Sequence, residues 1–316
     1  MPASVERSVV TLDPALDEIV SPNATVDVLR NGYFGFTEGP VWIQEGAGYL
    51  LFSDIAANVI YRWTPDNALS VFLAKSGYTG MAPAALRGYV QFNGRVYVSN
   101  IGSNGITVDK QGRLVFCAHG DRSIVRLEKD GARTTLADRY HGKRFNRPND
   151  IVIKSNGAVY FTDPRPNTPD MELPTSAVFL VQDGTVQLLD NDIRPNGLAF
   201  SPDEKFLYLV NTGSKIMRYD VLPDGTIANG RLFVDLGMDK TPGGADGLKV
   251  DQRGNLYSTG PGGVWIVSPD GRHLGTIRLP ETATNIAFGD ADARTLYITA
   301  RTSLARIRLR TPGIRP

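Results

Sequence analysis

The sequence is poor in the side chains that bind soft metal ions. Among 316 residues it has one cysteine, Cys117, and three histidines, His119, His141 and His273. A single thiol cannot form a disulfide within the chain or build a cysteine-based metal cluster. Three histidines leave little material for a histidine-rich zinc site. Disulfide scaffolds and cysteine-ligated metal domains are therefore excluded.

Two further absences concern charge of one sign and long apolar runs. The 34 basic and 33 acidic side chains give a formal net charge of +1. This balance argues against a nucleic-acid partner, because such proteins usually carry a strongly basic stripe. No run of about 18 apolar residues occurs, so we expect no transmembrane helix and no membrane partner. Residues 1–20 lack the basic start and apolar stretch of a signal peptide, which favours a cytoplasmic location.

Turn-forming residues, in contrast, are abundant and spread along the whole chain. There are 33 glycines and 20 prolines, which indicates many short elements joined by tight turns. A pattern of apolar strand, Gly- or Asp-containing turn and aromatic-rich strand occurs six times, and each copy predicts a β-hairpin. The turns with their second strands lie at residues 44–54, 109–119, 154–163, 201–211, 251–259 and 290–299.

Further strands extend each hairpin to a four-stranded unit. Third strands are predicted at 59–63, 124–127, 177–181, 216–219, 263–267 and 304–309, and fourth strands at 70–74, 133–136, 186–189, 232–236 and 274–279. Six units have five fourth strands, so the missing one is assigned to residues 26–29. An N-terminal strand that closes a ring removes an exposed sheet edge. The repeats predict an all-β fold, a six-bladed β-propeller with four-stranded blades closed by an N-terminal strand, and an open β-sandwich is the alternative.

The predicted propeller is a single domain over residues 25–316, preceded by an N-terminal extension over residues 1–24. The first two repeats are 66 residues apart and the later ones 39–50, which places an insertion at about residues 77–102. This insertion has its own hairpin, with strands at 89–92 and 95–98 around an Asn-Gly turn. It is either a surface elaboration or a lid or rim over the central channel.

Polar residues recur at the start of every first strand. These residues are Glu38, Asn104, Asn149, Asn196, Asp246 and Asn285. The first strands of a propeller line its central channel, so we expect these side chains to meet at one mouth. The competing interpretation is that they are turn residues that bond the local backbone. Buried carboxylates crowded together repel one another unless a cation lies between them.

A metal site is the hypothesis that follows from this convergence. Glu38, Asn149, Asn196 and Asp246 offer two carboxylates and two amide oxygens. Hard oxygen ligands without sulfur or imidazole favour Ca²⁺, and Mg²⁺, Mn²⁺, Zn²⁺ or Fe²⁺ stay open as alternatives. A structural zinc site is disfavoured by the same set of ligands.

Five motifs in order at blade spacing carry a resemblance to a known family. They are Phe-Thr-Glu-Gly-Pro-Val-Trp at 36–42, Ser-Asn-Gly-Ile-Thr-Val-Asp at 103–109, Asn-Arg-Pro-Asn-Asp-Ile-Val at 146–152, Arg-Pro-Asn-Gly-Leu-Ala-Phe-Ser-Pro-Asp at 194–203 and Ala-Asp-Gly-Leu-Lys-Val-Asp at 245–251. Over about residues 25–310 the chain resembles the senescence-marker-protein/gluconolactonase (regucalcin-like) family of six-bladed propellers. It looks most similar to the bacterial gluconolactonases, through residues 119–122 and 146–150. The insertion and residues 1–24 depart from the family pattern.

The resemblance implies a divalent metal at the channel mouth and hydrolysis of a sugar lactone to its aldonic acid. By the family pattern Glu38, Asn196 and Asp246 bind the metal, and Asn149 binds metal or substrate. The metal acts as a Lewis acid on the carbonyl oxygen, and a carboxylate takes the proton of the attacking water. Asp246 is the first choice for this base. Asp150 is the second, unless it is the buried partner of a neighbouring arginine.

Other polar residues are candidates for binding the substrate, a small-molecule sugar lactone. Arg147 and Asn149 would orient the lactone, and Asn104 would add a hydrogen bond from the second blade. His119 ends its strand at the same mouth, although a lone histidine is more often a structural residue. The identity of the lactone and the oligomeric state stay open.

Two other functions also stay open. Related propellers cleave organophosphates with a similar Glu, Asn, Asn, Asp metal site, so a phosphotriester hydrolase is one alternative. A non-enzymatic binding module is the other, because a fold does not determine a function. A serine hydrolase is disfavoured, since the sequence has no Gly-x-Ser-x-Gly nucleophile elbow.

Overall fold

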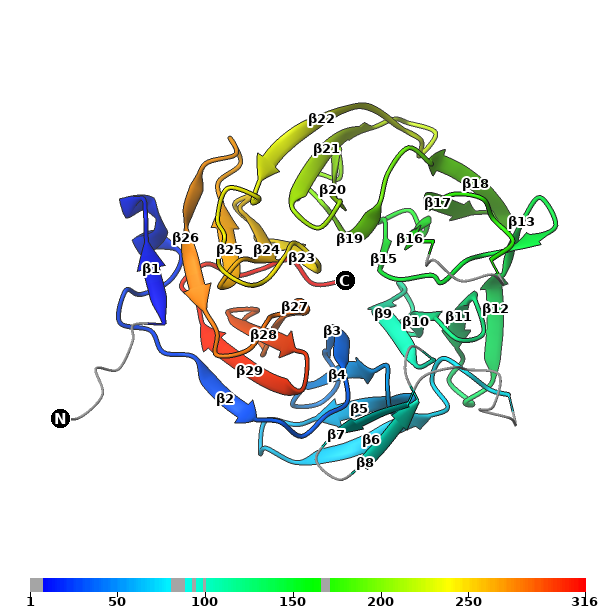
Figure 1. Cartoon of the computed structure of the whole chain (residues 1–316), viewed down its shortest axis with the longest axis horizontal. Coiled ribbons are helices and arrows are strands. Elements are labelled where there is room, and N and C mark those ends of the chain that lie inside the picture. Colours follow the sequence, from blue (N-terminus) through cyan, green and yellow to red (C-terminus); the bar gives the residue numbers. More distant parts are fainter. Residues whose placement is uncertain (1–7, 81–88, 93–94, 99–100, 166–170) are drawn as a thin grey trace.

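The computed structural model describes residues 8–80, 89–92, 95–98, 101–165 and 171–316. Six antiparallel sheets are arranged as blades around a central axis (Figure 1). The predicted all-β, six-bladed propeller is therefore confirmed. In these ranges the one helical element is a short 3-10 helix, η1 (Pro14–Glu18), and no helix has the length and apolarity to span a membrane.

In each blade the first strand lies innermost and the following strands pair antiparallel towards the outside (Figure 1). Blade 1 contains β3 (Thr37–Ile43), β4 (Tyr49–Asp54), β5 (Val59–Trp63) and β6 (Leu69–Ala74); blade 2 contains β9 (Ser103–Val108), β10 (Leu114–Ala118), β11 (Ser123–Leu127) and β12 (Arg133–Ala137). Blade 3 contains β15 (Ile151–Ile153), β16 (Val159–Asp163), β17 (Ala177–Gln182) and β18 (Thr185–Asp190); blade 4 contains β19 (Pro195–Phe200), β20 (Phe206–Asn211), β21 (Lys215–Val221) and β22 (Ile227–Asp235). Blade 5 contains β23 (Leu248–Val250), β24 (Leu256–Gly260), β25 (Gly263–Val267) and β26 (His273–Arg278); blade 6 contains β27 (Asn285–Gly289), β28 (Thr295–Ala300) and β29 (Ser303–Arg308). A small hairpin of β13 (Arg139–Tyr140) and β14 (Lys143–Arg144) follows blade 2.

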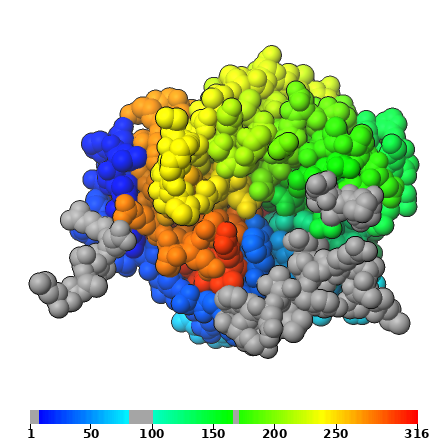
Figure 2. Space-filling view, viewed as in Figure 1, coloured from blue at the N-terminus to red at the C-terminus, as the bar shows by residue number. Residues whose placement is uncertain are grey.

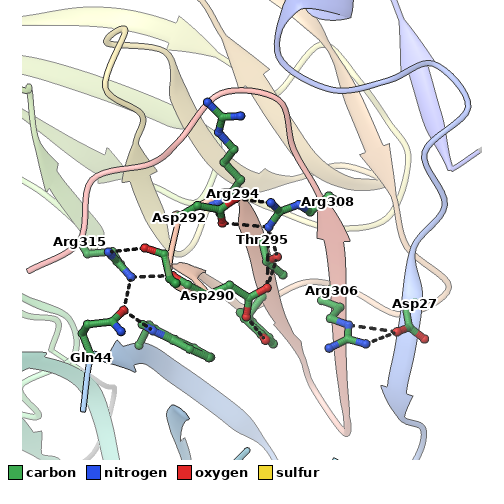
Figure 3. Close-up of polar contacts among 12 residues, drawn as sticks. Asp27, Gln44, Asp290, Asp292, Arg294, Thr295, Arg306, Arg308 and Arg315 are labelled. Atoms are coloured by element: carbon green, nitrogen blue, oxygen red, sulfur yellow. Dashed lines mark hydrogen bonds and ion pairs between the residues drawn. The ribbon is translucent and has the colours of Figure 1, made fainter. Parts of the chain in front are cut away.

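An N-terminal strand supplies the fourth strand of blade 6 and closes the ring. Strand β2 (Asp27–Arg30) pairs antiparallel with β29, with Val28 opposite Ala305. The Arg306 guanidinium lies 3.0 Å from the Asp27 carboxylate across this pair (Figure 3). The closing strand predicted at residues 26–29 is confirmed, with a shift of one residue.

The C-terminal segment adds a second connection between the last and the first blade. Arg315 Nη1 donates to Gln44 Oε1 at 2.9 Å and to the Asp290 carbonyl oxygen at 2.6 Å (Figure 3). Gln44 follows β3 of blade 1, whereas Asp290 follows β27 of blade 6. One guanidinium therefore links the two blades at which the chain closes on itself.

Residues 8–24 contribute to blade 5, which has five strands instead of four. Strand β1 (Val9–Thr11) pairs with the outer edge of β26, and the blue N-terminal segment lies against the orange fifth blade (Figure 2). Leu16 and Val20, in and after η1, are buried in the core cluster of blades 5 and 6. This fifth strand was not foreseen from the sequence.

The core lies between adjacent blades, because successive side chains of a strand point to opposite faces of its sheet. Val41 of β3 packs with Phe116 of blade 2, whereas the next residue, Trp42, packs with Tyr297 of blade 6. The rings of Trp42 and Tyr297 are stacked with 5.5 Å between centroids. Each first strand is thereby held by both neighbouring blades, which fixes the ends that meet at the channel.

The insertion is present where the repeat spacing placed it, between blades 1 and 2. The predicted hairpin is confirmed as β7 (Tyr89–Phe92) and β8 (Arg95–Val98), and its Asn-Gly turn lies outside the described residues. The two ends of the insertion meet, since a Cβ on Gly77 would lie 2.0 Å from the backbone of Gly102. Asn58 Oδ1 accepts the backbone N–H of Gly77 at 2.9 Å and anchors this base to blade 1.

Candidate functional site

The starts of the first strands meet at one mouth of the channel and bond to one another. Asn104 Nδ2 donates to Asn149 Oδ1, and Asn149 Nδ2 donates to Asn196 Oδ1 at 2.5 Å. On the other side of the mouth Asn285 Nδ2 donates to Glu38 Oε2 at 3.1 Å. The amides bond their counterparts on neighbouring blades, which a purely local turn role would not require.

The six strand-start residues form a ring at the mouth, and we call them the ring residues: Glu38, Asn104, Asn149, Asn196, Asp246 and Asn285. A glycine that follows the ring residue explains how the strand starts come so close together. Gly39, Gly105, Gly197 and Gly247 each follow a ring residue, and a Cβ on any of them would collide with the ring residue of the next blade. For Gly197 the colliding atom is the Asp246 carbonyl oxygen, at 2.0 Å, which also accepts the Gly197 N–H at 3.0 Å. The repeated pair of polar residue and glycine is therefore a packing requirement at the centre of the ring.

Three carboxylates lie within electrostatic reach of one another at this mouth. Burial raises the pKa of Glu38 from 4.5 to about 7; the Gly39 N–H opposes this shift, and the charge of Asp150 adds to it. Desolvation by the surrounding protein raises the pKa of Asp246 well above its usual value, and the charges of Glu38 and Asp150 raise it further. Such mutual repulsion is relieved by a cation between the carboxylates.

Asp150 follows the ring residue Asn149, and its Oδ1 lies against the start of β9, 2.6 Å from where a Cβ on Gly105 would be. Its side chain is buried, Oδ1 accepts the Ile151 N–H at 2.9 Å, and Oδ2 has no hydrogen-bond partner among the described residues. Burial raises the pKa of Asp150, and the positive charge of Lys249 lowers it in part. The cation that acts on this carboxylate is thus a lysine, and the arginine suggested by the sequence does not have that role.

The carboxylates at the ends of second strands have a different role from the residues of the ring. Asp54 accepts the N–H groups of Gly35 and Phe36 at 2.9 and 3.0 Å. Asp163 accepts the N–H of Arg147 at 2.6 Å, and burial raises the pKa of Asp163 to about 7. These carboxylates therefore hold the loops that lead into the first strands of their blades.

His119 and Arg147 lie near each other beside the ring. His119 is 8% exposed, and its Nδ1 has no partner among the described residues. Burial lowers the pKa of His119 from 6.5 to about 3, and the charge of Arg147 adds to this shift. In the described part of the chain the Arg147 guanidinium makes no hydrogen bond or ion pair. A neutral imidazole and an unengaged cation are therefore available to a ligand.

The donor set fits a hard divalent cation if the amides take part. No group of three or more His, Cys, Asp or Glu side chains within the described ranges could hold a metal ion by itself. Glu38 and Asp246 with Asn149 and Asn196 give two carboxylate and two amide donors at one mouth. Oxygen-only sets of this kind suit Ca²⁺ or Mg²⁺.

Sequence reasoning missed one charged residue of the channel and did not assign another ring residue. Lys249 follows Asp246 by three positions, and its charge acts on both Glu38 and Asp150. Its signal in the sequence is a single lysine between Leu248 and Val250 in a first strand. Asn285 was placed at the mouth but given no role, and it bonds Glu38.

Comparison with known proteins agrees with this fold. Residues 36–302 match the family model described as SMP-30/Gluconolactonase/LRE-like region. The gluconolactonase of Zymomonas mobilis is 34% identical, covering 99% of this chain and 89% of that protein. A pentonolactonase of Haloferax volcanii is 30% identical over 83% of this chain and 80% of its own length. The solved structure of a gluconolactonase from Xanthomonas campestris is 32% identical, has a TM-score of 0.81, and covers 98% of this chain and 97% of that one. The chain therefore belongs to the SMP-30/gluconolactonase/LRE-like family.

Proposed function

We propose that this protein is a metal-dependent lactonase that opens a sugar lactone to its aldonic acid. The observation that carries the proposal is the ring of carboxylates and amides at one mouth, with Arg147 and His119 beside it. Relatives named gluconolactonase and pentonolactonase, at 34% and 30% identity, support a sugar lactone as the substrate.

In this proposal Glu38, Asn149, Asn196 and Asp246 hold the metal, with Ca²⁺ as the first choice. When bound, a divalent ion would polarise the lactone carbonyl and stabilise the negative charge that develops on its oxygen. Repulsion between Glu38 and Asp246 is the physical reason for expecting a cation there.

Asp246 is the proposed general base. It is half-buried, whereas Asp150 is 4% exposed, so Asp246 is the more accessible of the two to water. Asp246 would take a proton from the water that adds to the carbonyl carbon. It would return that proton to the ester oxygen of the lactone as the bond between this oxygen and the carbonyl carbon breaks. No net proton is then left on Asp246. Asp150 is the second candidate.

Two amides of the ring and two side chains beside it would position the sugar. Arg147 carries a guanidinium that can donate two parallel hydrogen bonds to oxygen acceptors. Asn104 presents its amide from β9 of blade 2, and Asn149 presents its amide from the segment just before β15 of blade 3. The free Nδ1 of His119 would accept a hydrogen bond from a sugar hydroxyl, because its low pKa keeps the imidazole neutral.

The test is hydrolysis of D-glucono-1,5-lactone and a pentonolactone, followed with a pH indicator before and after EDTA treatment. Ca²⁺, Mn²⁺, Mg²⁺ and Zn²⁺ are then added back separately. We expect activity to be lost with EDTA and restored by a divalent ion. Bound metal without lactone hydrolysis would move the substrate class to phosphotriesters, and neither metal nor turnover would leave a binding module.

Two variants test the assignment of the ligands. Glu38→Gln and Asp246→Asn remove one carboxylate each with little change in shape, so we expect loss of metal binding and turnover with a retained far-UV spectrum. Glu45→Gln, on an exposed turn of the same blade as Glu38, is the matched control. Wild-type activity in both ring variants would refute the site.

A further inference from the structure

Lys249 is a charged residue in the interior of the channel, on the innermost strand of blade 5. It follows Asp246 by three positions in β23, between the buried residues Leu248 and Val250. Its side chain is half-buried, and Nζ donates to the Leu248 carbonyl oxygen at 2.8 Å. A lysine ammonium has three donors, so this single backbone contact does not account for its position.

The space next to Lys249 is a cavity of about 300 Å³ formed by the inner strands and covered by residues 314–316. The other cations on its wall are engaged or open to water. Lys154 pairs with Glu204 at 3.2 Å, Arg315 bonds Gln44, and Lys110 is exposed. Lys249 is thus the cation of this wall that has no acidic partner in an ion pair within the described residues, is partly buried, and lies three positions after the ring carboxylate Asp246.

The charges at the mouth fit a simple count. Glu38, Asp150 and Asp246 bring three negative charges when ionised, and Lys249 brings one positive charge that acts on the first two. A divalent cation in the ring would bring two more positive charges. Lysine and metal together then neutralise the cluster, whereas without the metal Lys249 is the internal charge that opposes the repulsion.

We propose that Lys249 is a positioning residue, a built-in counter-charge that stabilises the metal-free ring and sets how tightly the ring binds a divalent cation. The inference rests on the metal site of the proposed function. A fixed positive charge near the ring attracts the carboxylates and repels an incoming cation. The positive charge of Lys249 therefore stabilises the metal-free protein and lowers its affinity for a divalent cation.

The experiment compares Lys249→Met, which keeps most of the length of the side chain and removes its charge, with Lys249→Arg, which keeps the charge. Lys110→Met, at an exposed lysine of the same cavity wall, is the control for the loss of one positive charge. Ca²⁺ is titrated calorimetrically into each metal-free protein at about pH 9, where protons compete little for carboxylates. Unfolding temperatures are measured in EDTA and in saturating Ca²⁺.

We expect Lys249→Met to bind Ca²⁺ about tenfold more tightly than wild type, since one repulsive charge is gone. It should also unfold at a lower temperature in EDTA, so that Ca²⁺ raises its unfolding temperature by more than in wild type. Lys249→Arg and Lys110→Met should resemble wild type in both measurements.

Equal or weaker Ca²⁺ binding by Lys249→Met would overturn this inference and leave the proposed function intact. An equal loss of stability with and without Ca²⁺ would show a packing role and would overturn it as well. If Lys249→Met does not fold, Lys249→Gln is measured in its place, with the same expectations. A wild-type protein that binds no divalent ion would overturn both the inference and the metal site on which it rests.

Discussion

Replacing Gly197 with alanine tests whether the ring is held together by backbone contact between blades. The Cβ of the new residue would lie 2.0 Å from the Asp246 carbonyl oxygen, an atom of a neighbouring main chain that no side-chain rotation can move. Gly197 has no positive φ, so the cost is steric overlap and not strain of the local backbone. The two blades must move apart to accommodate the methyl group.

The size of the effect follows from the nature of this overlap. Overpacking a rigid site costs about 1–3 kcal/mol, and contact with backbone puts Gly197→Ala near 3 kcal/mol. With an unfolding entropy of about 2.1 cal/mol/K per residue, this cost lowers the unfolding temperature of a 316-residue chain by about 5 °C. The displacement also separates Asn196 from Asp246, so we expect Ca²⁺ affinity to fall by about tenfold, equivalent to roughly 1.4 kcal/mol.

Gly112→Ala is the matched control, because Gly112 has a φ of +71° and no atom lies within 4 Å of the position that the new methyl group would take. Its cost is left-handed backbone strain of about 1–2 kcal/mol, with no reason for a change in metal affinity. Unfolding is followed by circular dichroism and Ca²⁺ binding by calorimetry. If Gly197→Ala keeps the stability and the metal affinity of wild type, the blades are not interlocked as the structure implies.

Three further predictions concern pH, closure and substrate binding. Glu38 and Asp163 have pKa values raised to about 7, so the folded metal-free protein favours their protonated forms. The unfolding temperature in EDTA should therefore fall as the pH rises from about 4 to about 7. A rise over this range would contradict the burial of both groups. Arg315→Ala removes the hydrogen bonds to Gln44 and to the backbone of blade 6. It should lower the free energy of unfolding in urea by about 1–3 kcal/mol and leave lactone turnover unchanged. An unchanged free energy of unfolding would show that β2 alone closes the propeller. His119→Ala should raise KM for the lactone several-fold without moving the pH profile above pH 5, because the imidazole is already neutral there; a shifted profile would indicate that His119 titrates during turnover.

The sequence predicted the blades well because each hairpin combines β-branched and aromatic strands with a Gly- or Asp-containing turn. The closing strand was predicted because the sequence shows five fourth strands for six blades, so a sixth outer strand was needed. Strand β1 was missed because three residues, Val9–Thr11, carry too little pattern to indicate a pairing partner. Its partner strand, β26, lies near the other end of the chain, so no local pattern identifies the pairing.

The candidate site was predicted in part, for a related reason. The ring residues occupy the same position in each repeat. One polar residue there indicates little, whereas six at the same position indicate a shared site. Asp54 and Asp163 are aspartates like Asp246 of the ring. They differ from it in their contacts, because they accept hydrogen bonds from backbone N–H groups, and such contacts cannot be read from the sequence. Lys249 was missed because a lysine in a strand usually points to water, and the closed channel around it is visible only in three dimensions.

The proposed groups are not spread evenly around the mouth, and this asymmetry has a consequence for specificity. Asn104, His119 and Arg147 belong to blades 2 and 3 and the loops that join them, whereas Glu38 and Asp246 come from blades 1 and 5. The insertion begins after blade 1 and ends at blade 2, where Gly102 lies against Gly77 and leads directly into the first strand that carries Asn104. Substitution of ring carboxylates should therefore change metal binding and rate for every lactone alike. Exchange of the insertion should change the preference among lactones and leave the metal affinity as it is.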